Sequence, residues 1–161
     1  MNTKRVYLGL GTNTGNKNEN LARAIELLSL ALGSPVALSG IIESEPWGFE
    51  SENRFLNCVA AFDTRFSPTL LLDTTEEIER TLGRTRKSLN GQYSDRIIDI
   101  DILFYGNEII ESERLTIPHP LLHKRDFVLL PLQEIAPLLV HPRLHKKIEE
   151  LAKELNHNAL T

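Results

Sequence analysis

The sequence predicts an α+β fold in the order strand, helix, strand, strand, helix, strand, followed by further helical segments. Two amphipathic stretches with helical spacing alternate with stretches typical of β-strands. Each of these two helices has a favourable cap residue at its start and a glycine at its end. The length of 161 residues favours one domain, which we expect to span residues 1–161.

The first half of the chain supplies one strand, one helix and two more strands. The first strand is expected over residues 5–10. The glycines at positions 9, 11 and 15 lack the spacing of a phosphate-binding loop, so a tight turn is the expected role of the loop at 11–16 that follows the strand. The helix begins after Asn16 and ends at Gly33, because apolar residues recur between them at helical spacing. The next two strands are expected over residues 36–43 and 55–64.

The connection at residues 44–54 is longer than two antiparallel strands need, and it holds Trp47, the only tryptophan. Long loops inside a compact domain are usually functional. Trp47 and Phe49 therefore either form an aromatic lid or platform for a flat ring, or fold back on the core.

The second half of the chain adds a helix, a cationic loop and a strand. The helix is expected from Ser67 to Gly83, and the loop at 83–96 carries four basic residues against one aspartate. A short strand pair is expected at 108–112 and 114–117. An apolar segment broken by Pro131 and Pro137 then leads to a last helix with Leu144, Ile148, Leu151 and Leu155. This order is that of the ferredoxin-like class, so we expect a mostly antiparallel sheet between helices in an α/β/α arrangement.

The stretch from Arg96 to Phe104 alternates as a buried strand does. Ile98, Ile100, Ile102 and Phe104 fall on one face, while Asp99 and Asp101 share the other. Carboxylates one pleat apart have Cβ atoms roughly 7 Å apart, a span that suits one Mg²⁺ or two ions. The alternative is that nearby arginines pair with both aspartates at the sheet edge. The positive loop before this strand favours a polyphosphate, because guanidinium groups and a metal together bind phosphate oxygens.

Composition and charge narrow the class of partner. A net charge of −4 argues against a general nucleic-acid binder, and Cys58, the only cysteine, excludes an internal disulfide and fits a reducing compartment. No apolar run approaches the length of a membrane span. We therefore expect a cytoplasmic protein that acts on small molecules without a nucleic-acid or membrane partner, and we expect it to be a monomer.

Several short motifs stand in a fixed order along nearly the whole chain: Gly11-Thr12-Asn13-x-Gly15, Glu45-Pro46-Trp47-Gly48, Phe55-Leu56-Asn57, Ile78-Glu79, Gly83-Arg84-x-Arg86, the strand from Arg96 to Leu103, Leu115-Thr116-Ile117-Pro118-His119 and Arg125-x-Phe127. Together they resemble the 6-hydroxymethyl-7,8-dihydropterin pyrophosphokinase family of folate biosynthesis. The sequence departs from that family at Tyr93, the only aromatic residue in a loop where the family usually has tryptophan. It also departs at Asp95, where proline is common.

The resemblance implies transfer of a pyrophosphoryl group from ATP to the hydroxymethyl oxygen of the pterin, with release of AMP. It implies two Mg²⁺ ions held by Asp99 and Asp101, and it makes Arg84 and Arg96 loop residues that close over the β- and γ-phosphates. It also implies further ATP contacts, with the ribose for Glu79 and with phosphates for Arg86, His119 and Arg125. The pterin is expected to stack between Phe55 and Phe127, with its edge read by Asn57 and by the backbone around Ser44 and Trp47.

Two other classes of function stay open at this point. A different Mg²⁺-dependent nucleotide transferase, such as a glycosyltransferase with an Asp-x-Asp motif, needs a larger nucleotide-sugar domain than 161 residues provide. A non-catalytic ferredoxin-like module that binds a ligand does not need arginines converging on a carboxylate pair.

Overall fold

The helices and strands of the chain follow the predicted order. The computed structural model describes residues 2–45, 53–83 and 97–159, with side chains described as far as residue 156. The elements are β1 (Lys4–Thr12), α1 (Lys17–Leu32), β2 (Ala37–Leu38), β3 (Ile42–Ser44), β4 (Phe55–Thr64), α2 (Pro68–Thr81), β5 (Asp99–Tyr105), β6 (Ile110–Glu111), β7 (Thr116–Ile117), a 3₁₀ turn (Leu122–Lys124), α3 (Asp126–Ile135) and α4 (Ile148–Ala159).

The main sheet has its two longest strands, β1 and β4, side by side. The strand order is β2-β4-β1-β5, β3 also pairs with β4, and every described strand pair is antiparallel. β1 and β4 stay in register along the whole of β1, from the pair Lys4 and Thr64 to the pair Thr12 and Leu56. This order confirms the predicted α+β, ferredoxin-like class.

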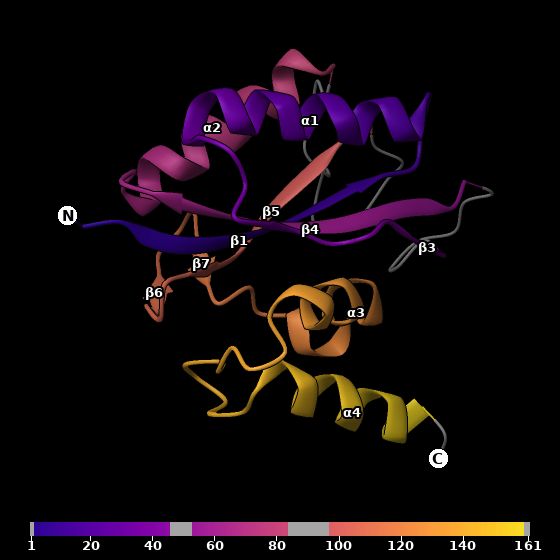
Figure 1. The fold of residues 1–161 in the computed structure, drawn as a ribbon, viewed down its shortest axis with the longest axis vertical. Coiled ribbons are helices and arrows are strands. Elements are labelled where there is room, and N and C mark those ends of the chain that lie inside the picture. The colour runs from indigo at the N-terminus through magenta and orange to yellow at the C-terminus, as the bar shows by residue number, and fades with distance from the viewer. Residues whose placement is uncertain (1, 46–52, 84–96, 160–161) are drawn as a thin grey trace.

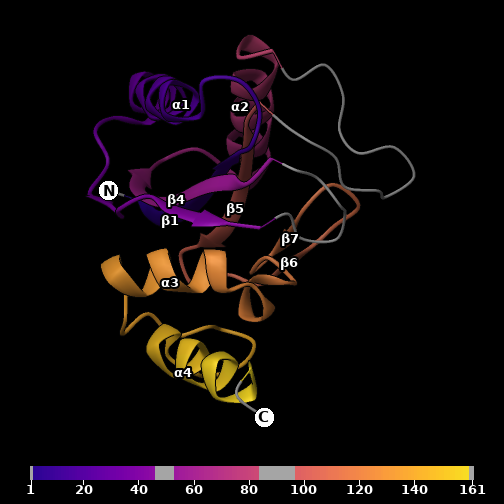
Figure 2. The same cartoon turned by 90° about the vertical axis from the view of Figure 1, so that its right-hand side faces the viewer.

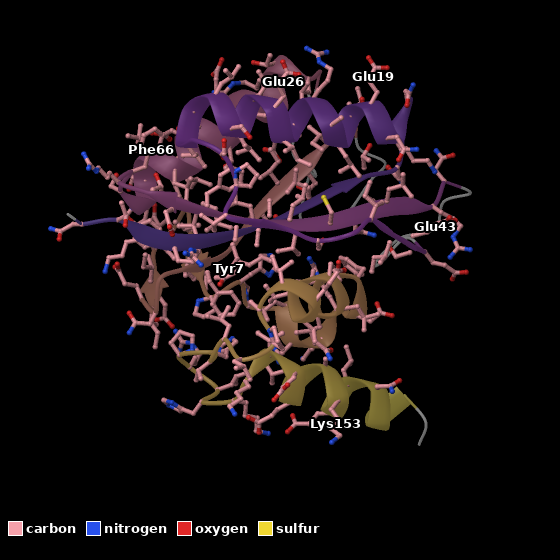
Figure 3. The ribbon with its side chains drawn as sticks, in the orientation of Figure 1. Tyr7, Glu19, Glu26, Glu43, Phe66 and Lys153 are labelled. Carbon is pink, nitrogen blue, oxygen red and sulfur yellow. The ribbon has the colours of Figure 1, made fainter. Side chains whose placement is uncertain are left out.

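Helices cover both faces of the main sheet. α1 and α2 lie on one face, α3 lies on the other, and α4 packs against α3 on its outer side (Figures 1 and 2). One apolar core lies between the sheet and the first pair of helices, and a second core joins the sheet to α3 and α4. Tyr7 lies on the α3 side, whereas Glu19 and Glu26 project from α1 away from the sheet (Figure 3). The predicted α/β/α layering is confirmed, with α4 outside α3.

The caps of α1 and α2 confirm the sequence prediction. The side chains of Asn16 and Ser67 each accept a hydrogen bond of 3.2 Å from a backbone N–H three residues further on. Gly33 and Gly83 follow the two helices with φ angles of 93° and 106°, in the region that favours glycine.

The strand predicted over residues 36–43 is instead two short strands, β2 and β3, separated by a bulge. Three residues of this segment, 39–41, stand opposite two residues of β4. Ser39 stabilises the break, because its hydroxyl accepts a hydrogen bond from Val59 N–H at 2.8 Å and donates one to the Gly40 carbonyl at 2.8 Å. The Gly40 N–H in turn donates to the Glu134 carboxylate of α3 at 3.1 Å. The bulge sets the register that pairs Ser44 with Phe55.

A second bulge, at Leu103 in β5, corrects the predicted alternation. Tyr7 pairs with Phe104, but Leu8 pairs with Ile102, so Leu103 is an extra residue in the ladder. Phe104 therefore leaves the face shared by the isoleucines and lies on the α3 side, with its ring centroid 6.1 Å from that of Tyr7. The aspartates precede the bulge, so it does not change their face.

The C-terminal third differs from the prediction at two places. Pro131 lies inside α3 and does not end the segment. Proline carries no backbone N–H, so α3 lacks one helical hydrogen bond there, but the Pro131 ring is buried. Leu144 precedes α4, because the His141 Nδ1 atom accepts hydrogen bonds from Arg143 N–H and Leu144 N–H and closes a turn there. The predicted short strand pair is confirmed as β6 and β7. Within residues 2–45, 53–83 and 97–159, no helix combines the length and hydropathy of a membrane span.

Candidate active site

A pocket on the α3 face of the sheet collects most of the described residues that the sequence singled out. Its floor comes from β1, β4 and β5, and α3 and the end of β3 supply its walls. The predicted site residues that line it are Ser44, Phe55, Asn57, Asp99, Asp101, Arg125 and Phe127. Segments far apart in the sequence therefore converge on one cavity.

Two carboxylates, those of Asp99 and Asp101, form one side of this pocket. Both residues are half-buried and both line the cavity, as the alternation of β5 predicts. Their neighbours across the β1 ladder are Gly11 and Gly9, which place no side chain between the carboxylates and the cavity. Paired carboxylate oxygens with open space beside them are a donor set that fits Mg²⁺.

The opposite side of the pocket combines aromatic rings with a fixed amide. Phe55 and Asn57 alternate along β4 on the pocket face, and both are buried. The Asn57 side-chain nitrogen donates a hydrogen bond of 2.8 Å to the Ser44 hydroxyl, which orients the amide. From α3, Phe127 enters the same cavity, and the Arg125 guanidinium lies 5.6 Å from the centre of its ring. Rings plus an oriented amide suit a flat heterocycle with polar edges.

His119 lies beside this pocket rather than in its lining, and its backbone is tied to β5. Its N–H donates to the Leu103 carbonyl at 3.0 Å, and its Nδ1 atom accepts a hydrogen bond from Leu121 N–H at 3.2 Å. Burial, together with the positive charge of Arg125, lowers the pKa of His119 to about 4, while the negative charge of Asp99 opposes the shift. The imidazole is therefore neutral at pH 7, and its proton lies on Nε2, since Nδ1 is an acceptor.

Glu79, predicted near the ATP ribose, is buried on α2 with 4% of its surface exposed. Its Oε2 atom accepts a hydrogen bond of 2.9 Å from the backbone N–H of Ile100. Ile100 stands between the two aspartates on β5, so this contact holds the strand that carries them. The ribose contact stays a prediction.

Four predicted site residues, Trp47, Arg84, Arg86 and Arg96, lie outside the described residues, as do Tyr93 and Asp95. Their roles stay predictions that rest on the resemblance.

The sequence reading missed the part of the pocket that β1 provides. The strand runs to Thr12, two residues beyond its predicted end at Leu10, so Gly11 is a strand residue and not part of the predicted loop; it lines the cavity together with Gly9. Gly15, with a φ of 76°, lies in the connection between β1 and α1. Glu45, Val59 and Val128 also line the pocket. Glycines two apart in a strand share a face, and this spacing is the signal that could have revealed them.

Comparison with known proteins decides the family. Residues 7–137 match the family model described as 7,8-dihydro-6-hydroxymethylpterin-pyrophosphokinase (HPPK). The chain belongs to the HPPK family. The predicted activity is confirmed at this level: HPPK proteins are enzymes of folate biosynthesis that transfer a pyrophosphoryl group, with ATP as the co-substrate. Neither alternative class of function is supported.

Two HPPK relatives match this chain along most of their length, and a solved structure shares its fold. The chain is 47% identical over 138 residues to 2-amino-4-hydroxy-6-hydroxymethyldihydropteridine pyrophosphokinase of Porphyromonas gingivalis, covering 85% of this chain and 93% of the relative. It is 40% identical to the Aquifex aeolicus enzyme of the same name, covering 92% and 91%. The crystal structure of Plasmodium falciparum HPPK-DHPS superposes with a TM-score of 0.77 at 18% identity, over 95% of this chain and 43% of that one. This last similarity shows the shared fold.

Proposed function

We propose that the pocket under α3 holds ATP and 6-hydroxymethyl-7,8-dihydropterin side by side and transfers pyrophosphate between them. The observation that carries this proposal is the convergence of two carboxylates, two aromatic rings and an oriented amide on one cavity of an HPPK chain. The carboxylates come from β5, the amide and one ring from β4, and the second ring from α3.

The pterin occupies the β4 side of the pocket in this proposal. Phe55 and Phe127 stack on its two faces, and Asn57 hydrogen-bonds its polar edge together with the backbone around Ser44 and Trp47. Support comes from the short hydrogen bond between Asn57 and Ser44, which fixes the amide before the substrate arrives. A preformed edge contact costs no side-chain entropy on binding.

The triphosphate occupies the β5 side, where Asp99 and Asp101 hold two Mg²⁺ ions. When bound, these ions would neutralise part of the negative charge of the phosphate oxygens. Arg125 and the Nε2–H of His119 add hydrogen-bond donors, and neutral His119 donates without requiring a proton from solution. By the family resemblance, Arg84, Arg86 and Arg96 bind the phosphates and Glu79 lies near the ribose.

The reaction itself is a substitution at the β-phosphorus. The hydroxymethyl oxygen forms a bond to this phosphorus, the bond from phosphorus to the oxygen bridging to the α-phosphate breaks, and AMP leaves with that oxygen. The hydroxyl proton is released. Such transfers depend on alignment and charge neutralisation more than on a strong base, so the protein mainly positions the substrates.

A direct assay tests this function. The chain is incubated with ATP, Mg²⁺ and 6-hydroxymethyl-7,8-dihydropterin, and AMP and the pterin diphosphate are measured together. Equal amounts of both products are expected, with none when the pterin or Mg²⁺ is left out. Absence of AMP contradicts the proposal, and AMP formed without the pterin identifies ATP hydrolysis instead.

We further propose that the chain acts as a cytoplasmic monomer with no nucleic-acid or membrane partner. Its single cysteine is buried and its net charge is −4, which favour a reducing compartment and disfavour a nucleic-acid partner. Light scattering coupled to size-exclusion chromatography is expected to give a mass near 18.2 kDa.

A further inference from the structure

The floor of the pocket contains two glycines of β1, Gly9 and Gly11, which alternate with the buried core residues Leu8 and Leu10. The strand pairing places Gly11 between Asn57 of β4 and Asp99 of β5. Gly9 lies in the same way between Val59 and Asp101. The two glycines, called the glycine floor below, therefore separate the proposed pterin side from the proposed triphosphate side.

The backbone conformation of β1 does not require glycine at position 9. In the part of the chain that the structure describes, positive φ angles of glycines occur at positions 15, 33, 83 and 106, not in β1. β1 pairs with β4 without interruption, so no bulge involves Gly9 on that side. A Cβ atom at Gly9 would lie 3.4 Å from the Leu103 side chain, which is an ordinary contact. Glycine weakens a strand, and close approach of a ligand is a common reason for keeping one there.

Gly11 has a different environment. A Cβ atom there would lie 3.2 Å from the Asn57 side-chain oxygen and 3.6 Å from the Phe55 ring. The Asn57 side chain cannot move away freely, because its nitrogen donates a hydrogen bond to the Ser44 hydroxyl. Substitution of Gly11 therefore disturbs the amide on the pterin side, whereas a Cβ atom at Gly9 contacts the Leu103 side chain and leaves this amide untouched.

We propose that Gly9 and Gly11 are positioning residues whose missing side chains open the gap through which the pterin hydroxymethyl oxygen reaches the β-phosphorus of ATP. This inference rests on the proposed function. Reacting atoms must come within about 3–3.5 Å of each other, and a displacement of about 1 Å slows such a reaction roughly 100-fold. A methyl group at either position rises between the two substrates and keeps them apart. With the methyl group at Gly9, each substrate alone keeps its contacts on β4 or β5.

The test compares three glycine-to-alanine variants. Gly9→Ala and Gly11→Ala change the glycine floor. Gly40→Ala is the matched control, because Gly40 does not line the pocket and a Cβ there would meet only the Glu134 carboxylate at 3.6 Å. For each variant, kcat, both KM values and the melting temperature are measured. Calorimetry with Mg²⁺ then gives the affinities for the dihydropterin and for α,β-methylene ATP, each alone and in the presence of the other.

Gly9→Ala is expected to lower kcat at least about 10-fold, while each ligand alone binds within about 3-fold of wild type. Binding of the second ligand to the protein loaded with the first weakens about 10-fold, and the melting temperature stays the same or rises because alanine stiffens the strand. Gly11→Ala shows these effects and also binds the pterin alone more weakly. Gly40→Ala behaves as wild type.

Two results overturn the inference: a Gly9→Ala enzyme with wild-type kcat and unchanged coupling between the ligands, or a loss of activity that accompanies a lower melting temperature, which identifies a structural glycine. Gly9→Ala decides the matter if Gly11→Ala does not fold. Failure of the proposed function is distinguishable, since the wild-type chain then releases no AMP. The coupling between the two ligands, measured by binding alone, still tests the glycine floor in that case.

Discussion

The two faces of the main sheet differ in what their residues do. On the face covered by α1 and α2, β1, β4 and β5 present a continuous set of buried apolar side chains, among them Val6, Leu8, Phe62, Ile100 and Ile102. On the α3 face, the same three strands carry apolar residues at one end, such as Tyr7 and Phe104. At the other end, two glycines lie among amide and carboxylate side chains around the pocket.

This difference separates stability from chemistry within single strands. Neighbouring residues of β5 alternate between a sealed core and an open site, so the core holds the strand in place while the other face stays free to bind ligands. The α3 face retains less apolar burial near the pocket, and the strand there contains glycines that weaken it. The first face therefore supplies the rigidity that the second face requires for alignment.

The largest expected effect comes from substituting Asp101, which lies on the pocket face of β5. Asp101→Asn is expected to lower kcat by at least about 1,000-fold, because an amide is a poor ligand for Mg²⁺. Its unfolding free energy should stay within about 1 kcal/mol of wild type, since Asp101 is half-buried at the pocket. Steady-state AMP release and chemical denaturation measure the two quantities.

Ile100→Val is the matched control, because Ile100 is the neighbour of Asp101 on the other face of β5. Removing one buried methyl group is expected to cost about 0.5–1.5 kcal/mol of unfolding free energy with kcat within a factor of a few of wild type. If Asp101→Asn keeps near-normal turnover, or if Ile100→Val loses as much activity as Asp101→Asn does, the separation between the two faces is wrong.

A second prediction concerns Glu79 of α2, which accepts the hydrogen bond from the Ile100 N–H between the two aspartates of β5. Glu79→Ala leaves this buried N–H without its acceptor and is expected to cost about 1–3 kcal/mol of unfolding free energy. A misplaced β5 should also lower kcat about 10-fold. Glu79→Gln keeps an acceptor oxygen and should restore most of both quantities.

The predicted ribose contact of Glu79 gives a different outcome in the same experiment. A large rise in the KM for ATP in Glu79→Gln, with unfolding free energy unchanged, identifies direct recognition of ATP. Equal stability of the alanine and glutamine variants would show that the hydrogen bond to Ile100 does not hold the strand.

The sequence permits prediction of the order of elements and of the face that Asp99 and Asp101 share, because each depends on local spacing and alternation. The bulge at Leu103 cannot be predicted in this way, because Leu103 and Phe104 are both apolar and can be buried on either face of the sheet. The break at Ser39 cannot be predicted either, because the Ser39 hydroxyl replaces a backbone hydrogen-bond partner only when β4 lies beside it. Such features follow from pairing between distant segments and not from the segment itself.

The site shows the same limit. The rings, amide and carboxylates carry chemical signals that a motif reveals, and the family resemblance names them. Gly9 and Gly11 carry no side chain, so their contribution is visible only when β4 and β5 are placed on both sides of β1. A pocket is defined as much by such positions as by the groups that bind.

The smallest expected effect is a dependence of stability on pH that arises on the α3 face, where His141 packs against Phe104. Burial, together with the nearby groups His123, Arg143 and His145, lowers the pKa of His141 to about 4. Because the unfolded side chain titrates near 6.5, the unfolded chain binds the proton more readily. Stability is therefore full above pH 6.5 and falls as the pH drops toward 4, by about 1 kcal/mol from this residue at pH 5.5.

His141→Asn supplies the matched control, because an asparagine oxygen can accept the two backbone hydrogen bonds that Nδ1 accepts now and does not titrate. Urea denaturation of both proteins at pH 7.5 and pH 5.5 is expected to show a smaller loss of stability in the variant. The remaining loss comes largely from His119, whose pKa is also lowered to about 4 by burial. An identical loss in both proteins would mean that His141 does not couple folding to pH.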